Sequence, residues 1–206
     1  MNMPTNTPDE ELSILFGAFC DGLHQEARAR RMAKLTIGAS GVDLGVSLTQ
    51  ARETEVASSL YFHLRSIGFF VQMESYFATG NQRRRPDFRI WLPVTRTYLY
   101  LELKLVAWGR GWRFYGKPAL EDIGKLAQET DPQNLPNGLA MIGFDNPDAH
   151  ERLEQKCQKL SEDITQQHPS YQRVGLQSVD LQGLDARTSC AMVGLWVRKC
   201  PTQPAD

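Results

Sequence analysis

Cysteines are few in this sequence: four occur in 206 residues, and no two form a CxxC pair. They lie at Cys20, Cys157, Cys190 and Cys200. No combination of cysteine and histidine has the spacing of a zinc site, which excludes the common zinc-binding modules. Because disulfide scaffolds use many closely spaced cysteines, the four thiols indicate a reduced, intracellular protein.

Long hydrophobic runs and a targeting segment are also missing. No apolar stretch approaches the ~20 residues that cross a bilayer. The first residues, MNMPTNTPDEEL, have no basic segment of the kind that opens a secretory signal peptide. The glycine-rich stretch 36–47 lacks the GK[ST] that would complete a phosphate-binding P-loop. We therefore expect a soluble, cytoplasmic protein with no membrane partner.

The chain as a whole has little excess charge, since its net charge is −1, but the charge is unevenly distributed. From Arg83 to Lys117 there are nine basic residues and two acidic ones, a local net charge of +7. From Glu121 to Asp163 there are ten acidic residues and four basic ones, a local net charge of −6. This asymmetry favours an anionic partner near the middle of the chain, although a mixed solvated surface would also produce it.

The length and the hydrophobic fraction of 41% suit one compact domain, which we expect to span residues 9–200. Residues 1–8 are expected to be disordered and residues 201–206 to form a mobile tail. Helices are predicted over 9–33, 49–67, 118–128 and 148–166, and strands over 69–75, 87–93, 98–106, 139–144, 174–181 and 190–197.

Local signals refine these elements. Asp9 is expected to cap the first helix and Pro118 to begin the third. Residues 108–116 are expected to form an aromatic, basic loop before that third helix. Because helices and strands alternate in the middle of the chain, the predicted fold class is α/β, with a mixed β-sheet flanked by helices and an extra N-terminal helix.

The predicted strands 87–93 and 98–106 contain the candidate catalytic residues. A four-residue turn at Val94–Thr97 would pair Pro93 with Tyr98 and Asp87 with Lys104, and opposed residues share a face. One face is then wholly apolar, with Phe88, Ile90, Leu92, Leu99, Leu101, Leu103 and Leu105. The other face holds Asp87, Arg89, Trp91, Tyr98, Tyr100, Glu102 and Lys104. A slip of one residue would mix the two sets, so the pattern itself selects this arrangement.

Two carboxylates and one ammonium group therefore come together on the polar face. The carboxylates of Asp87 and Glu102 would repel each other unless a cation lay between them. Mg²⁺ prefers such oxygen ligands, and a lysine beside it can stabilise charge at a phosphoryl group. The alternative is a structural ladder of ion pairs, Asp87 with Lys104 and Arg89 with Glu102, which is common on hairpins.

Pro86–Asp87 followed by Glu102–Leu103–Lys104 resembles the motif of the PD-(D/E)xK nuclease superfamily. The resemblance covers about residues 49–144 and implies a restriction-endonuclease-like core. It implies Mg²⁺ or Mn²⁺ as cofactor, with Asp87, Glu102 and the backbone carbonyl of Leu103 as ligands. It also implies that Lys104 acts on the attacking water.

Members of this superfamily often add a glutamate from the preceding helix. Glu53 lies on the apolar stripe of Val56 and Leu60, which packs on the sheet, whereas Glu55 points away from it. Glu53 is therefore the expected catalytic carboxylate, and Glu55 remains the alternative.

Basic residues around the motif are candidates for nucleic-acid contacts. Arg83, Arg84 and Arg85 directly precede Asp87 and suit backbone phosphates, with a solvated loop as the alternative. Arg110 and Arg113 alternate with aromatic residues, as in surfaces that stack bases, although the rings could instead cover the sheet edge. Lys125 lies where the resemblance implies a basic residue near the phosphate, with a solvated helix face as the alternative.

The sequence thus predicts a metal-dependent nuclease, a hydrolase that cleaves phosphodiester bonds of nucleic acid, with DNA as the expected substrate. The principal alternative is a catalytically silent module of the same fold that binds nucleic acid or a protein partner. A third is an interaction domain in which the motif is coincidental. Cleavage of both strands of a duplex would favour a homodimer.

Overall fold

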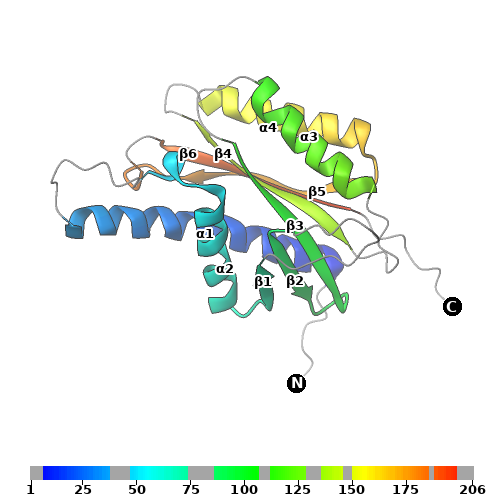
Figure 1. Ribbon diagram of the computed structural model, residues 1–206, viewed down its shortest axis with the longest axis horizontal. Coiled ribbons are helices and arrows are strands. Elements are labelled where there is room, and N and C mark those ends of the chain that lie inside the picture. Colours follow the sequence, from blue (N-terminus) through cyan, green and yellow to red (C-terminus); the bar gives the residue numbers. More distant parts are fainter. Residues whose placement is uncertain are drawn as a thin grey trace.

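The computed structural model describes residues 7–37, 47–73, 86–106, 112–128, 136–145, 150–185 and 188–198. Its elements are α1 (Pro8–Ile37), a 3-10 helix (Leu48–Gln50), α2 (Glu53–Ser66), β1 (Val71–Met73), β2 (Phe88–Leu92), β3 (Thr97–Val106), α3 (Trp112–Gln128), β4 (Asn137–Asp145), α4 (His150–Gln167), β5 (Tyr171–Asp180) and β6 (Cys190–Arg198) (Figure 1). The predicted disorder of residues 1–6 and the predicted tail 201–206 lie outside the described residues.

The six strands form one mixed sheet in the order β1-β2-β3-β4-β6-β5. Only β3 and β4 pair in parallel, and the other neighbours pair antiparallel. A parallel pair needs a long crossover connection, and α3 lies within the segment that links β3 to β4. The predicted α/β class with a mixed, helix-flanked sheet and an N-terminal helix is confirmed.

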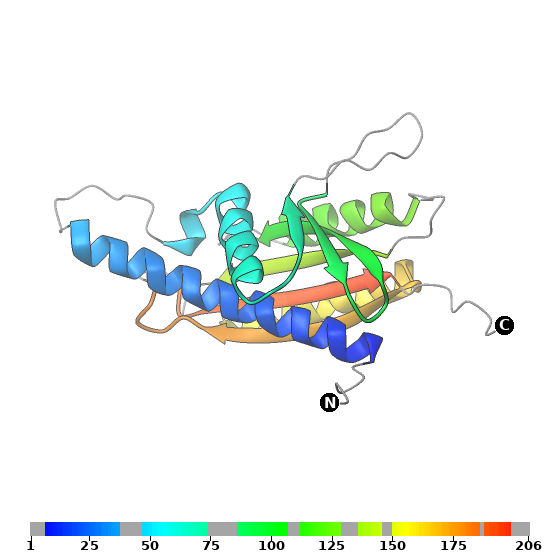
Figure 2. The same ribbon diagram turned by 90° about the horizontal axis from the view of Figure 1, so that it is seen from below.

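The sheet lies between two helical layers. In Figure 1, α3 and α4 lie above the sheet and α1 and α2 lie below it. Figure 2 shows α1 running along much of the molecule beneath the strands. One buried apolar cluster joins α1 and α2 to the sheet, and a second joins α3 and α4 to its opposite face. Each face of the central strands is therefore covered by helices. Among the described residues, no helix is long and apolar enough to cross a membrane.

The β2–β3 hairpin has the predicted faces but not the predicted register. Leu92 pairs with Thr97, so the turn is Pro93–Arg96 rather than Val94–Thr97. Arg96 adopts a left-handed backbone with φ of 53°, which closes the turn one residue earlier. Each residue of β2 therefore pairs with a residue of β3 two positions earlier in the sequence than predicted.

A shift of two residues preserves the side-chain faces, because the strand period is two. The apolar face is buried as predicted and packs in the cluster with α1 and α2. What changes is which polar residues are neighbours. Arg89 lies opposite Tyr100, and continuing the register places Asp87 beside Glu102 rather than beside Lys104.

The start of α1 corrects two predictions. The helix begins at Pro8, inside the segment 1–8 that was expected to be disordered, and Asp9 is not its cap. Instead the Thr7 hydroxyl accepts the backbone N–H of Glu10 at 3.3 Å, and the Glu10 carboxylate accepts the N–H of Thr7 at 2.6 Å. This reciprocal capping box, with proline at the first helical position, sets the boundary.

The start of α3 is also earlier than predicted. The helix begins at Trp112, so the backbone from Trp112 to Gly116 is helical and not part of a loop. Pro118 lies inside the helix rather than at its first position. The predicted helix 49–67 is likewise divided into a 3-10 turn and α2.

Candidate functional site

The site is built at the end of β3, where β2 stops pairing with it. The pairing of the two strands ends at Phe88 and Leu101, while β3 continues to Val106. The N–H of Tyr100 donates to the Pro136 carbonyl on the β4 side. Since N–H directions alternate along a strand, the N–H and C=O groups of Leu103 and Leu105 point to the opposite edge, which β2 has left.

Two carboxylates satisfy the N–H groups on this edge. Asp87 Oδ2 accepts the N–H of Leu103 at 2.7 Å. Glu53 Oε2, from the first turn of α2, accepts the N–H of Leu105 at 3.0 Å. The first helical turn of α2 and the residue before β2 are therefore both fixed to β3 by charge-assisted hydrogen bonds.

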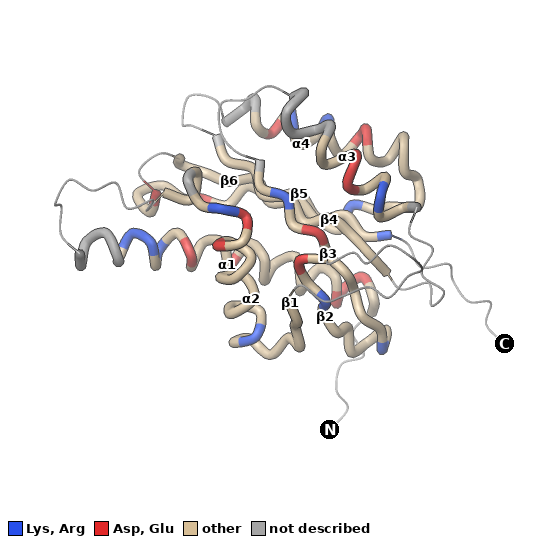
Figure 3. Tube along the Cα trace, in the orientation of Figure 1, with Lys and Arg blue, Asp and Glu red and all other residues tan. Residues whose placement is uncertain are grey.

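Glu102 and Lys104 project from β3 toward the layer of α3 and α4. In the parallel register they lie beside Leu139 and Met141, which belong to the apolar cluster on that side. Lys104 Nζ is 3.0 Å from Asp122 Oδ2, and the same carboxylate accepts Lys125 Nζ at 2.8 Å. Figure 3 shows acidic and basic positions of α2, β3 and α3 gathering around this end of the strand. Lys104 pairs with Asp122 of α3, and the register does not place Asp87 opposite Lys104 or Arg89 opposite Glu102, as the alternative ladder of ion pairs would need.

The carboxyl group of Glu102 has a strongly raised pKa. Burial, together with the negative charges of Asp87 and Asp122, raises this pKa to about 7. Glu53 contributes in the same direction, while Lys104 partly offsets the effect. An excess of negative charge therefore surrounds Glu102, and a cation at this place would relieve it.

Lys104 is held in its charged form. Burial alone would lower its pKa, but the hydrogen bond and charge of Asp122 raise the pKa above the usual value, together with the charges of Glu53 and Glu102. Burial likewise opposes ionisation of Asp122, yet its hydrogen bonds to Lys125 and Lys104 lower its pKa. The Lys104–Asp122 pair is thus an ammonium and a carboxylate, and Lys104 is suited to stabilise negative charge rather than to remove a proton.

The donor groups at the end of β3 are carboxylate and carbonyl oxygens, which a hard divalent cation prefers. In the part of the chain that the structure describes, no three histidine, cysteine, aspartate or glutamate side chains are grouped so that they could hold a metal ion. Mg²⁺, however, usually takes one or two protein carboxylates and completes its shell with water and substrate phosphate. Asp87 and Glu102 supply two carboxylates from neighbouring strands, and the Leu103 carbonyl points to the edge of β3 at which Asp87 lies.

The two glutamates of α2 have different surroundings. Glu53 reaches the edge of β3, as described above. Glu55 is exposed, accepts the N–H of Arg52 at 3.2 Å and bonds Arg30 at 3.3 Å. The hydrogen bond from Arg52 and the contact with Arg30 lower the pKa of Glu55. The structure brings Glu53 to the site and leaves Glu55 on the outer side of the helix, where it caps α2.

The structure describes only some of the residues that were predicted to contact nucleic acid. Arg83, Arg84, Arg85 and Arg110 lie outside the described residues, and for Arg113 only the helical backbone is described. Lys125 is exposed on α3 and shares Asp122 with Lys104. Lys125 therefore lies next to the site, because its ammonium group and that of Lys104 contact the same carboxylate.

Asp122 is the residue that the sequence prediction overlooked. It lies beside the buried stripe of Ala119, Ile123 and Leu126 on α3 and three residues before Lys125. A carboxylate at the border of an apolar stripe is directed toward the sheet, which is the signal that could have identified it.

Comparison of the chain with protein-family models, with curated proteins and with solved structures gave no match, so the functional interpretation depends on the residues at the end of β3 themselves.

Proposed function

We propose that this chain is a metal-dependent nuclease of the PD-(D/E)xK type, with a restriction-endonuclease-like core, that hydrolyses phosphodiester bonds in DNA. The observation that carries the proposal is the convergence of Glu53, Asp87, Glu102 and Lys104 on one end of β3. These groups come from α2, from the residue before β2 and from β3 itself.

The order of elements supports the proposal. The superfamily that the motif resembles uses an antiparallel strand pair with a helix before it and a helix after it. Here α2 precedes the antiparallel strands β1, β2 and β3, and α3 leads from them to the parallel strand β4. The motif residues therefore occur in the structural context that the resemblance requires.

Each residue has a distinct role in the proposed reaction. Asp87, Glu102 and the Leu103 carbonyl would hold Mg²⁺ or Mn²⁺. Such an ion supplies Lewis-acid activation of water and neutralises charge on the phosphoryl group. Glu53 fixes the edge of β3 through the Leu105 N–H and adds negative charge near Glu102. Lys104, kept protonated by Asp122, stabilises the negative charge that develops on the phosphate.

The two glutamates of α2 provide a matched test of the site. Glu53→Gln is expected to reduce Mg²⁺-dependent cleavage by roughly 10–100-fold, the usual effect of losing a residue that supports metal ligands. Glu55→Gln should leave the rate close to wild type, because that side chain is exposed and glutamine can still cap α2. Cleavage of supercoiled plasmid and of single-stranded DNA, with Mg²⁺ or with EDTA, measures both. Equal rates for the two variants would exclude Glu53 from the site.

One observation favours a second candidate function, a catalytically silent module that binds nucleic acid or a protein. Asp87 and Glu53 already satisfy N–H groups of β3, so both carboxylates have a structural use without any cation. DNA binding in EDTA, with no cleavage and no Mg²⁺ or Mn²⁺ binding, would select this second function.

A further inference from the structure

The polar face of β1, β2 and β3 carries an aromatic row in addition to the charged site. Trp91 lies opposite Tyr98, and its N–H donates to the Phe70 carbonyl at 2.9 Å. The rings are in contact, with centroids 4.9 Å apart for Trp91 and Tyr98 and 6.5 Å apart for Phe70 and Tyr98. We refer to Phe70, Trp91 and Tyr98 as the aromatic row.

This aromatic row shares a face with the candidate catalytic site. Side chains two residues apart on a strand point the same way, so Tyr98, Tyr100 and Glu102 follow one another along one face of β3. Trp91 and Asp87 are four residues apart, which corresponds to about 13 Å along the strand. A few nucleotides of an extended strand would cover this distance, so a DNA strand cleaved beside Asp87 could pass over the aromatic row.

Positive charge accompanies the rings. The Arg89 guanidinium lies 3.8 Å from the centre of the Tyr98 ring, and that of Arg65 lies 5.8 Å from the centre of Phe70. The Arg89 Nη1 donates to Gln72 at 3.2 Å, while its buried Nε has no hydrogen-bond partner among the described residues. Arg89 covers one face of the Tyr98 ring, and both guanidinium groups can meet the phosphates of a strand whose bases stack on the remaining ring faces of the row.

The aromatic row is also accessible. The side chain of Phe70 is 46% exposed, and Trp91 and Tyr98 are half-buried. Phe70 and Trp91 also line one wall of a pocket of about 390 Å³, whose other walls come from Glu11 and Ile14 of α1 and from the residues that follow α2. Part of the surface of both rings is therefore open to a ligand.

We propose that the aromatic row, with Arg65 and Arg89, is a binding site for unpaired nucleobases of single-stranded DNA. The proposal rests on the proposed nuclease function, because it assigns the row to the same substrate. Its consequence is a preference for substrates with an unpaired segment a few nucleotides away from the cleaved bond. Stacking accepts any base, so the row should contribute affinity without sequence preference.

The test measures binding without cleavage. The full chain is titrated in EDTA against fluorescent oligodeoxythymidylate and against a blunt duplex, by fluorescence anisotropy. Trp91→Leu removes the aromatic ring and keeps an apolar side chain, and it should raise the Kd for the single strand roughly ten-fold. Trp91→Phe keeps an aromatic ring and should retain most of the affinity. The duplex Kd should change little in either variant.

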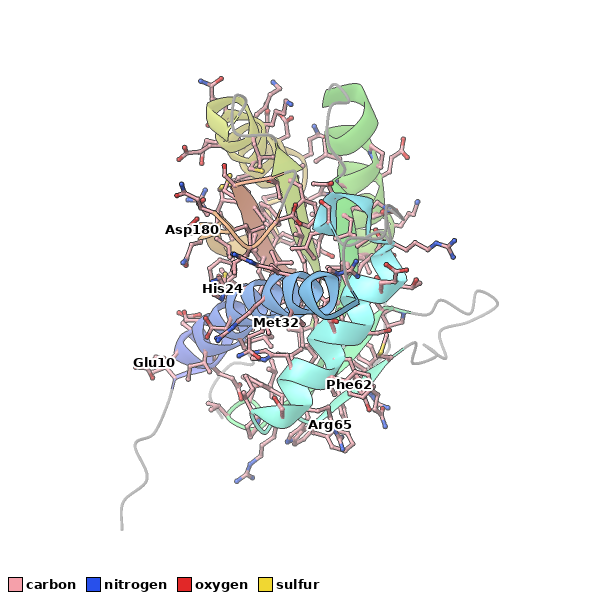
Figure 4. The ribbon with its side chains drawn as sticks, turned by 90° about the vertical axis from the view of Figure 1, so that its left-hand side faces the viewer. Glu10, His24, Met32, Phe62, Arg65 and Asp180 are labelled. Carbon is pink, nitrogen blue, oxygen red and sulfur yellow. The ribbon has the colours of Figure 1, made fainter. Side chains whose placement is uncertain are left out.

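A matched control comes from α2. Phe62 is 69% exposed and contacts the Tyr61 ring, and Figure 4 shows it on α2 together with Arg65. Phe62→Leu removes an exposed ring outside the aromatic row and should leave the single-strand Kd unchanged. Far-ultraviolet circular dichroism and thermal unfolding check that each variant folds. If Trp91→Leu prevents folding, Tyr98→Leu serves the same comparison.

The outcomes separate this proposal from the nuclease proposal. Equal single-strand affinity for wild type, Trp91→Leu and Tyr98→Leu overturns the base-binding site, whether or not the protein cleaves DNA. A wild-type dimer that Trp91→Leu converts to a monomer, with unchanged DNA affinity, overturns it as well, because the aromatic row would then bind a second copy of the chain. Ring-dependent binding without Mg²⁺-dependent cleavage supports the base-binding site and contradicts only the nuclease function.

Discussion

Lys104→Ala is expected to reduce Mg²⁺-dependent DNA cleavage by about 10²–10³-fold while leaving the fold intact. The ammonium group lies 3.0 Å from Asp122 and is kept charged by that carboxylate and by Glu53 and Glu102. Removing a preorganised group that stabilises charge in the transition state typically has an effect of this size. Plasmid nicking under single-turnover conditions measures the rate.

Two further variants identify the role of Lys104. Lys104→Arg keeps the positive charge and should retain part of the activity, although the guanidinium has a different shape. Lys159→Ala removes an exposed lysine of α4, away from the site, and should behave as wild type. Cleavage by Lys104→Ala at the wild-type rate, or complete loss in Lys159→Ala, would contradict the assigned role.

Glu102→Gln is expected to stabilise the protein at alkaline pH in the absence of metal. Burial and the neighbouring carboxylates raise the pKa of Glu102 from the usual 4.5 to about 7 in the folded state. A carboxyl group with a raised folded pKa contributes stability that is fully present below about pH 4.5 and is lost as the pH rises through about 7. The ionised carboxylate therefore destabilises the wild type at pH 8, and glutamine removes this penalty.

The difference should be large enough to measure. A shift of this size corresponds to roughly 3 kcal/mol at pH 8, or a Tm about 5–10 °C higher for the variant. Below pH 5 the two proteins should have similar Tm values, because the wild-type carboxyl is then neutral like the amide. Thermal unfolding in EDTA across this pH range gives the comparison. A Tm difference that does not depend on pH would show that Glu102 is not surrounded by uncompensated negative charge.

The hairpin shows which parts of the structure could be predicted from the sequence. Face assignment depends only on the alternation of apolar and polar residues, and a strand keeps that alternation whatever its register. The pairing register depends in addition on the turn, which the left-handed backbone of Arg96 closes at Pro93–Arg96. For this reason the polar set was correct while its partners were wrong, and Glu102 rather than Lys104 lies beside Asp87.

The segment before Pro118 shows where local signals fail. Glycine, proline and mixed aromatic residues weigh against a helix in residues 108–118, yet α3 begins at Trp112 and continues through Pro118. Local propensity is a weak guide that tertiary context overrides. The apolar stripe of α3 could have shown that Asp122 faces the sheet, but not that it pairs with Lys104, because this contact joins α3 to β3 and depends on how the helix packs on the sheet.

The central claim is that Asp87, Glu102 and the Leu103 carbonyl form a divalent-cation site, and calorimetric titration with Mn²⁺ tests it most directly. Wild-type protein should bind Mn²⁺ saturably at pH 8, and more weakly below about pH 7, where Glu102 takes up a proton. Asp87→Asn and Glu102→Gln should bind it much more weakly, although asparagine can still accept the Leu103 N–H. No binding to the wild type, or equal affinity in all three proteins, would contradict the account.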